Sequence, residues 1–507
     1  MHRATRLAFL FPWLPLGLAL LPAIAAAALP AACDLHWQVT PQRGATPPQV
    51  AVALTFDAGN RSRTELQLPE GSELALLATE GTPALEAVPG RPLSRSVAHR
   101  PGERLTLRFA LVPGPSAWLR LAPNSLVFAA TALLPLPVDR SPERSTQQMC
   151  LGIDGLADGD ALLANQGQLS SSNGDRLLRL QGPASLAREW VVAAGALQQA
   201  ERRVEGQAQR VVMAAAAPMA FNAEALADAA AKQIGTVRRF WTDGEAPEQL
   251  LVLLPAPADT SPRGLALRQA LLLQAPAPLT LPGAEIEALL MQTALQGWFR
   301  ERFGPVAYEQ RPDDPMNHWF SLGFAAFYSQ RLRSATAQWS LQTHAAALST
   351  LLQPATAAAG ATPWLAMRWH GALREQGHAG LDAVLKRLML PAAQARAAGP
   401  LSSPLATHRL QAALRPVLAD APRRDLRELV EHPGAIVPTP QTLGPCFRYD
   451  AALRQVLPAT DGEPSTACTG WLNGSAAAVS ATARSTTPAP KAKAAAKAKK
   501  KSKRGRH

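Results

Sequence analysis

Several features that many enzymes require are absent from this sequence of 507 residues. It contains no Gly-x-Ser-x-Gly elbow, phosphate-binding loop or dinucleotide fingerprint, so a serine hydrolase and a nucleotide-dependent enzyme have no support. After the N-terminal 30 residues no apolar run approaches 18 residues, which predicts no transmembrane segment in the mature protein. Four cysteines and 47% hydrophobic residues exclude a small disulfide scaffold and a wholly disordered chain. The length suggests roughly two to four domains.

Lysine is scarce outside one short segment. Only nine lysines occur, and seven of them lie in residues 491–507, which carry nine positive charges in all. Subtracting those nine and two leader arginines from the formal charge of +13 leaves +2 for the rest. We expect a disordered Ala/Lys-rich basic tail over 473–507. Because no aromatic residue interleaves its lysines, the tail predicts contact with anionic envelope polymers or lipids, or simple solubilisation, and no sequence-specific nucleic-acid recognition.

The N-terminus has the pattern of a secretory signal peptide. Arg3 and Arg6 precede an apolar run over 7–21, and alanines up to Ala28 offer A-x-A cleavage sites. The run is too short for a membrane span and contains two prolines. We therefore expect removal of residues 1–28 and an exported protein, either periplasmic or associated with the cell envelope.

Export favours disulfide bonds, and four cysteines allow three pairings. Cys33 and Cys150 bracket the first part of the chain, whereas Cys446 and Cys468 bracket the last part. We expect pairing within each of these two sets, because each bridge would then close one domain. Pro30 disfavours lipoprotein processing at Cys33, and no cysteine has the context of a catalytic nucleophile.

Hydrophobic patterning predicts an α+β multidomain protein that begins with a β-sandwich-like domain over 33–200. Strands are expected at 50–56 and 64–68, as partners across a turn at 57–60. Alternation over 104–111 places Leu105, Leu107, Phe109 and Leu111 on one face of a strand. Asn173-Gly174 is a hairpin signal.

Helical spacing dominates the next region, 201–400. Asn222 can cap a helix over 222–241, and a short strand is expected at 250–254 with a second extended segment at 264–273. Further helices are expected at about 284–303, 318–333, 336–352, 364–375 and 380–390. A small C-terminal helical and irregular region should follow over 401–472.

Local motifs in this region occur in a familiar order. Pro262–Arg268 is similar to the Gly-Gly-Leu-Glu-His-Arg edge strand of a known protein family. Gln292–Trp298 stands where the same family has His-Glu-x-x-His-x-Trp. Arg302 and Pro305 match a basic residue and a proline after that helix, Trp319–Tyr328 is similar to Trp-x-x-Glu-Gly-Phe-x-x-Tyr-Tyr, and Leu381–Arg387 to a downstream helix start. The chain over 50–390 thus resembles the glycyl aminopeptidase-like metallopeptidases of the gluzincin class, and more distantly aminopeptidase N. This resemblance implies a thermolysin-like mixed domain with a small sheet and helices, a zinc cofactor, and an edge strand that holds the substrate backbone.

The chemically demanding residues of that family differ here. Its two zinc-binding histidines correspond to Gln292 and Gln296, its zinc-binding glutamate to Leu322, and its general base to Thr293. A glutamine amide is a poor zinc ligand, leucine has no donor atom, and a threonine hydroxyl is no base near neutral pH. The edge-strand glutamate and histidine are Ala266 and Leu267. The resemblance therefore implies a retained fold without its catalyst and without bound zinc.

We interpret the chain as an exported, catalytically inactive metallopeptidase-like protein that binds a peptide or a protein partner. The residues expected to line its cleft are Gly264, Leu265, Ala266, Gln292, Thr293, Gln296 and Leu322. One alternative is an active zinc-dependent peptidase with an atypical metal site. A second alternative is a structural envelope protein attached through its basic tail.

The other titratable residues of this region give the active-enzyme alternative little support. His370, Glu375 and His378 are spaced by five and three residues, which is not the i, i+4 spacing of a helical zinc pair. The remaining acidic and imidazole side chains are interpreted as solvated helix positions and as isolated histidines, respectively: Glu285, Glu287, Glu301 and Glu309; His318, His344 and His408.

Overall fold

The computed structural model describes residues 33–473 apart from short gaps. The gaps are 59, 71, 77–83, 115–117, 139–145, 173–174, 205–209, 217–222, 246–247, 257–259, 277–282, 304–318, 353–356, 390–402, 432–435 and 461. The leader, the basic tail, Asn173-Gly174, Asn222, Pro305, Glu309 and His318 lie outside the described residues, as does the side chain of His408. No helix in the described part of the chain is long and apolar enough to cross a membrane.

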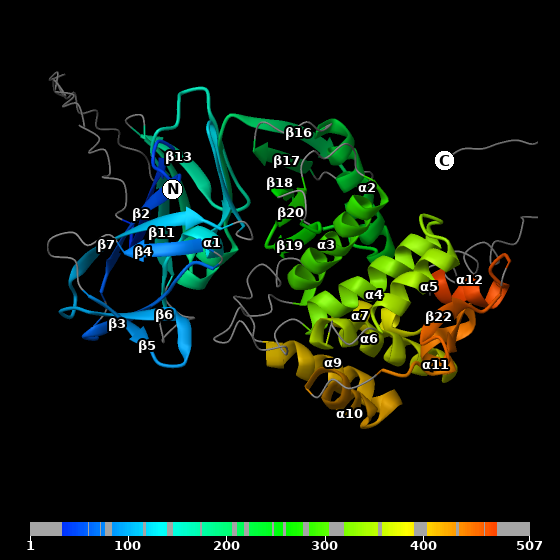
Figure 1. The fold of residues 1–507 in the computed structure, drawn as a ribbon. Helices are drawn as coiled ribbons and strands as arrows, with labels where there is room; N and C mark the ends of the chain where they lie inside the picture. The colour runs from blue at the N-terminus through cyan, green and yellow to red at the C-terminus, as the bar shows by residue number, and fades with distance from the viewer. Residues whose placement is uncertain are drawn as a thin grey trace, which may run out of the picture.

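The described strands of the N-terminal part form three sheets, drawn in blue to teal in Figure 1. The largest has the order β13-β14-β11-β1-β2-β7-β4, the second β10-β3-β6-β5, and the third β12-β15-β9-β8. Short helices α1 (Ala130–Leu133) and η1 (Ala184–Glu189) lie beside them. The bounds of the first sheet are β1 Leu35–Gln42, β2 Gln49–Asp57, β4 Ser72–Leu76, β7 Arg104–Pro113, β11 Gln147–Ile153, β13 Gln168–Ser172 and β14 Asp175–Gly182. Those of the other two are β3 Arg63–Gln67, β5 Leu85–Val88, β6 Arg91–Ala98 and β10 Leu136–Val138, then β8 Leu119–Ala122, β9 Ser125–Ala129, β12 Ala161–Ala164 and β15 Val191–Gly195.

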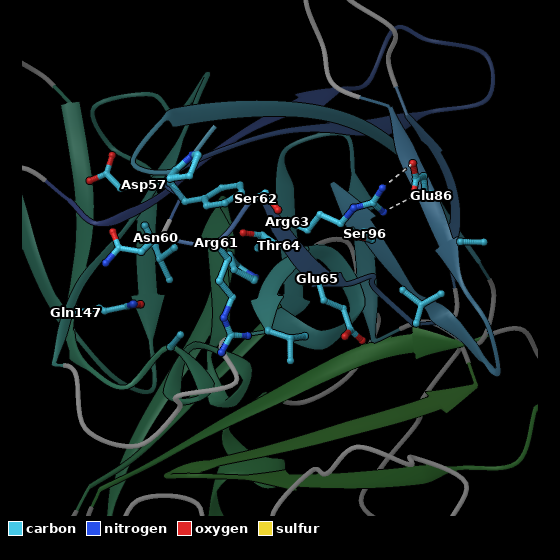
Figure 2. A pocket seen from close by; sticks show the side chains of 18 of the residues that line it. Asp57, Asn60, Arg61, Ser62, Arg63, Thr64, Glu65, Glu86, Ser96 and Gln147 are labelled. Carbon is cyan, nitrogen blue, oxygen red and sulfur yellow. Dashed lines mark hydrogen bonds and ion pairs between the residues drawn. The ribbon is translucent and has the colours of Figure 1, made fainter. Parts of the chain in front are cut away.

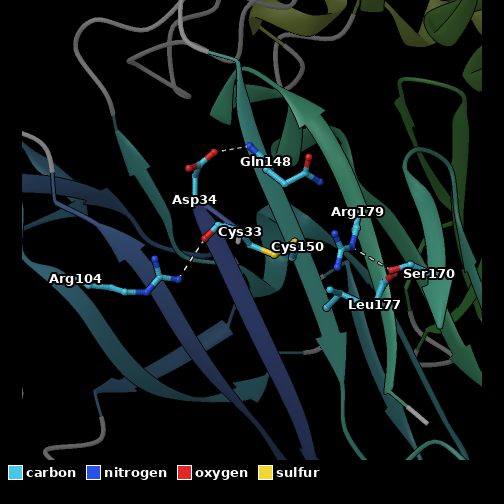
Figure 3. Close-up of a disulfide and its surroundings, with 8 residues drawn as sticks. All are labelled: Cys33, Asp34, Arg104, Gln148, Cys150, Ser170, Leu177 and Arg179. Carbon is cyan, nitrogen blue, oxygen red and sulfur yellow. Dashed lines mark hydrogen bonds between the residues drawn. A yellow bond between two sulfur atoms is a disulfide. The ribbon is translucent and has the colours of Figure 1, made fainter. Parts of the chain in front are cut away.

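The alternation predicted for 104–111 is confirmed. Leu105, Leu107, Phe109 and Leu111 are all buried on β7, and they pack in one core with residues of the neighbouring strands. Two further predictions hold in this sheet. β13 and β14 pair as an antiparallel hairpin in which Ser172 lies opposite Asp175. Figure 3 shows the expected disulfide between Cys33, directly before β1, and Cys150 in β11, which ties two parallel neighbouring strands together.

The predicted pairing of 50–56 with 64–68 is wrong. Both segments are strands, but β2 pairs with β1 and β7, whereas β3 belongs to the second sheet and pairs with β6 and β10. Both edges of β2 are already occupied, and the residues between the strands carry the chain from one sheet to the other. Both edges of β3 are paired in that sheet, and Leu66 of β3 is buried in the core of the N-terminal part.

The middle of the chain is built around a five-stranded sheet in the order β16-β17-β18-β20-β19. Its strands are β16 Leu197–Arg203, β17 Arg210–Ala216, β18 Gln249–Ala256, β19 Arg263–Leu267 and β20 Ala270–Pro276. Helices α2 (Ala223–Trp241) and α3 (Ala284–Phe303) pack on one face of this sheet, and the β8–β9–β15 region packs on the other face. Figure 1 shows this sheet between the β-rich part and the helices. The mixed α+β architecture agrees with the fold class expected from the sequence.

The extended segment predicted over 264–273 is two strands. β19 and β20 form an antiparallel hairpin in which Leu267 lies opposite Ala270, and Gln269 turns the chain at φ 55°. Carboxylates from distant elements hold this turn: Glu189 accepts a hydrogen bond from the Arg268 amide (3.0 Å) and Glu301 from the Gln269 amide (3.1 Å). Because these two contacts hold it, the turn forms without the glycine or asparagine that usually marks a turn in the sequence.

Helices fill the rest of the chain. They are α4 (Trp319–Ala335), α5 (Leu341–Thr350), α6 (Ala357–Glu375), α7 (Leu381–Leu388), α9 (Ser403–Leu418), α10 (Ala421–Leu426), α11 (Pro440–Leu443) and α12 (Thr466–Asn473). The predicted start at residue 336 is wrong for α5, because Ser340 caps that helix by accepting a hydrogen bond from the Thr343 amide. The predicted start at 364 is also late, since α6 already begins at Ala357. A small hairpin of β21 (Phe447–Asp450) and β22 (Gln455–Pro458) precedes α12, and the expected Cys446–Cys468 disulfide joins the two.

Candidate functional site

The edge strand and the helix that the sequence motifs bring together are in direct contact. Gly264 of β19 packs on α3, and a Cβ added at this glycine would lie 2.0 Å from Thr293 Oγ1 and 3.3 Å from Leu289 Cδ1. Farther along, a Cβ at Gly297 of α3 would lie 3.2 Å from a methyl of Leu271 and 3.6 Å from Ala266. Two glycines thus let the strand hairpin and the helix approach closely.

The expected cleft residues divide into buried and accessible ones. Ala266, Thr293 and Gln296 are buried, with 3%, 1% and 7% of their surface exposed. The Thr293 hydroxyl donates to the carbonyl of Leu289 (2.7 Å), one helical turn earlier. The other members are accessible to solvent: Gly264, Leu265 and Gln292 are half-buried, and Leu322 on the neighbouring helix α4 is exposed.

These residues do not fit the zinc ion that the sequence resemblance implies. None of Gln292, Thr293, Gln296 and Leu322 offers an anionic oxygen, an imidazole nitrogen or a thiolate. Within the described residues, no group of three or more His, Cys, Asp or Glu side chains could hold a metal ion.

His370, Glu375 and His378 do not converge. His370 is fully buried on α6, and its Nδ1 accepts a hydrogen bond from the amide of Leu381 (3.2 Å). Burial and the nearby positive charge of Arg331 lower the pKa of His370 to about 3, so its ring is neutral at physiological pH. Glu375 and His378 lie exposed at the end of the same helix.

Helix α4, which carries Leu322, is fixed by a buried ionic network. Arg331 is fully buried and donates two hydrogen bonds to Asp382 of α7 (2.6 and 2.8 Å), and Tyr328 donates a third (2.8 Å). Burial by itself would raise the pKa of Asp382, but the charge of Arg331 and the hydrogen bonds from Arg331 and Tyr328 hold it below its usual value. Arg331 also donates through Nε to the carbonyl of Leu472 (2.9 Å), which ties α4 to the C-terminal helix α12.

A second buried network anchors the end of α3. Trp298 donates to Asp243 (2.8 Å), Arg302 binds both oxygens of the same carboxylate, and Trp241 stacks on Trp298 with ring centroids 4.5 Å apart. Although burial opposes ionisation, the bonds from Arg302, the Glu245 amide and Trp298 lower the pKa of Asp243. The tryptophan and arginine of the sequence motif therefore have a structural role in this chain.

Glu301 was not recognised from the sequence. It was expected on the solvated face of its helix, but its carboxylate accepts hydrogen bonds from the Gln249 side chain and the Gln269 amide, both at 3.1 Å. Burial raises its pKa. Glu189 has a similar function from the N-terminal part: it holds Arg300 at 2.6 Å as well as the Arg268 amide. The two carboxylates position the β19–β20 turn from opposite sides, and neither lies near the turn in sequence.

Similarity to known proteins is found only at the level of structure. No protein-family model and no curated protein matches the sequence. An aminopeptidase N family protein from Idiomarina loihiensis has 12% identity over 70% of this chain and 69% of its own, with a TM-score of 0.52. The chain shares this fold. An M1 zinc metallopeptidase from Deinococcus radiodurans (18% identity, 80% of this chain and 94% of its own, TM-score 0.49) and Legionella pneumophila aminopeptidase A in complex with aspartic acid (12%, 79% and 50%, 0.48) are also similar.

Proposed function

We propose that this chain is an exported, catalytically inactive relative of the zinc aminopeptidases that binds a peptide or a protein partner beside β19. The observation that carries the proposal is the replacement at Gln292, Thr293, Gln296 and Leu322 inside a framework that keeps its close packing. A side chain without a donor atom at position 322 cannot complete a zinc site, and Thr293 has its hydroxyl bonded to its own helix.

The edge strand offers a structural basis for binding without hydrolysis. β19 pairs only with β20 in its sheet, so its other edge is open to an added strand within the described residues. An extended peptide can pair with such an edge through its main chain while side chains beside the strand give selectivity. Leu265, Gln292 and Leu322 are the accessible side chains of the expected site, two apolar and one amide.

The first test is hydrolysis. Aminoacyl and peptidyl fluorogenic amides incubated with the purified chain and added zinc should release no fluorophore above the rate of a heat-inactivated control. Release that disappears with a zinc chelator and returns with zinc would contradict inactivity and favour the alternative of an active peptidase with an atypical metal site.

The second test is peptide binding at the edge strand. Gly264→Val places a side chain where Thr293 already lies, so it should push β19 from α3 and weaken binding of peptides selected on the native protein. Gly44→Ala is the matched control, because a Cβ at that glycine meets nothing within 4 Å. Equal binding by both variants would exclude β19 as the docking strand. The proposal that the basic tail contacts anionic envelope polymers or lipids is independent of this site.

A further inference from the structure

The N-terminal part contains a large hollow far in sequence from the peptidase-like motifs. Its volume is about 1280 Å³, and its walls come from the second sheet, from the ends of β1 and β2, and from the segment 60–62 between β2 and β3. Figure 2 shows side chains from these elements gathered around it. Pockets that hold drug-sized ligands measure about 300 to 1,000 Å³, so this hollow has room for a short chain.

One wall is the polar face of the second sheet. Val138, Glu65, Ser96 and Glu86 lie directly opposite one another on four adjacent strands, and all four line the hollow. Cross-strand partners share a face of the sheet, so these side chains form one row. The opposite face carries Leu66 and is part of the core.

The acidic side chains among the lining residues are paired with arginines. Glu86 pairs with Arg63, Glu65 with Arg91 at 2.8 Å, and Asp57 with Arg104 at 2.8 Å.

Arg61 differs from these arginines: it lines the hollow, is exposed, and has no carboxylate partner among the described residues. In the view of Figure 2 its side chain lies between Asn60 and Gln147 on one side and Glu65 on the other. Among the described residues of the lining, Arg61 is thus a cation without a carboxylate partner, which favours an anionic group on the ligand.

A second unsatisfied group lies at the start of β11, in the first sheet. The Oε1 atom of Gln147 is buried and has no hydrogen-bond donor among the described residues. A buried acceptor of this kind is costly unless a ligand or a water molecule donates to it. Asn60, Ser62 and Ser96 add further hydrogen-bonding groups.

We propose that this hollow binds an extended peptide through a carboxylate of that peptide. Arg61 pairs with the carboxylate, Asn60, Ser62 and Ser96 hydrogen-bond the peptide backbone, and Val88, Pro89 and Val138 contact apolar side chains. A sugar chain is disfavoured because the one aromatic residue in the lining, Phe56, has 2% of its surface exposed and offers no ring face for stacking. This site is separate from the edge strand β19 and does not depend on the proposed function.

The test uses the full chain and an array of labelled hexapeptides that contain no acidic residue. Each peptide is made in two forms, one with a free C-terminal carboxylate and one with a C-terminal amide. Fluorescence anisotropy should detect carboxylate peptides that bind the native protein, while their amides bind about tenfold more weakly or not at all. Arg61→Ala should lose the same factor of about ten, and Asn60→Ala a few-fold. Arg108→Ala is the matched control, an exposed arginine of β7 outside the hollow, and should leave binding unchanged.

Three results would overturn the proposal. They are equal binding of carboxylate and amide forms, unchanged affinity in Arg61→Ala, and no peptide binding up to about 1 mM. Polygalacturonate is included as a probe, and its binding through Arg61 in place of any peptide would identify an anionic glycan site instead. Gly264→Val should leave peptide binding at the hollow unchanged. A loss of binding at the hollow can therefore be distinguished from a loss of binding at β19. Matching far-UV circular dichroism of Arg61→Ala and the native protein shows that the variant is folded.

Discussion

Removing one partner of the buried pair between Arg331 and Asp382 should strongly destabilise the helical part. The two side chains have 0% and 1% of their surface exposed, and Asp382 accepts three hydrogen bonds, two from Arg331 and one from Tyr328. Asp382→Ala leaves a guanidinium buried without its counter-charge, which costs about 3–5 kcal/mol in comparable buried pairs. For a part of about 200 residues this corresponds to a fall in Tm of roughly 10 °C.

The measurement is urea unfolding at pH 7, followed by tryptophan fluorescence, with calorimetry for the Tm. Glu86→Ala is the matched control, because the Arg63–Glu86 pair is more than half exposed and its loss should cost less than about 1 kcal/mol. The double variant Arg331→Met/Asp382→Leu removes both charges and should recover most of the loss. A cost for Asp382→Ala no greater than the control, or a double variant as unstable as the single one, would refute the reasoning.

Three further predictions concern pH, the C-terminal bridge and the tail. Burial lowers the pKa of both His344 and His370 to about 3, so below pH 6.5 the unfolded chain binds more protons than the folded chain, and the free energy of unfolding decreases as the pH is lowered, by up to about 1.4 kcal/mol per pH unit for each ring. His344→Gln should halve this slope in urea titrations, and a free energy of unfolding that stays constant from pH 7 to 5 would contradict the burial of the two rings. Replacing Cys446 and Cys468 by alanine opens a loop of 22 residues and should cost about 3 kcal/mol in the same unfolding assay, and an unchanged midpoint would show that α12 docks without the bridge. Deleting residues 487–507 removes the nine tail charges and should abolish co-sedimentation with anionic lipid vesicles at low salt, whereas unchanged sedimentation would exclude the tail as the anchor.

Local patterns were sufficient to predict many elements of this fold. The alternation in β7 is confirmed because its partner strands bury one face of it, and the helix over 284–303 is confirmed with Ile286, Leu290, Ala294 and Trp298 buried. Both disulfides are confirmed because each pair of cysteines brackets a compact part of the chain.

The wrong predictions concern turns, strand pairings and burial that depend on tertiary contacts. The β19–β20 turn has no turn sequence of its own, because Glu189 and Glu301 bind its amides from two other elements. The partner of β2 was misassigned because one edge of β2 pairs with β1, the strand directly before it, and the other edge pairs with β7, which follows β3–β6 in the chain. At the candidate site, the contact between Gly264 and Thr293 agrees with the order of the sequence motifs. The burial of Thr293 and Gln296 could not be predicted, because it depends on how tightly α3 packs against the sheet, and no local sequence pattern determines that packing.

The most direct test of the account is the zinc content of the purified mature chain after incubation with zinc and removal of unbound metal. Mass spectrometry of the metal should find far less than one zinc per native chain, whereas the variant Gln292→His/Gln296→His/Leu322→Glu, which supplies three ligands at the aligned positions, should retain more. One zinc per native chain, accompanied by peptide hydrolysis that a chelator abolishes, would contradict the claim that this fold has lost its catalyst.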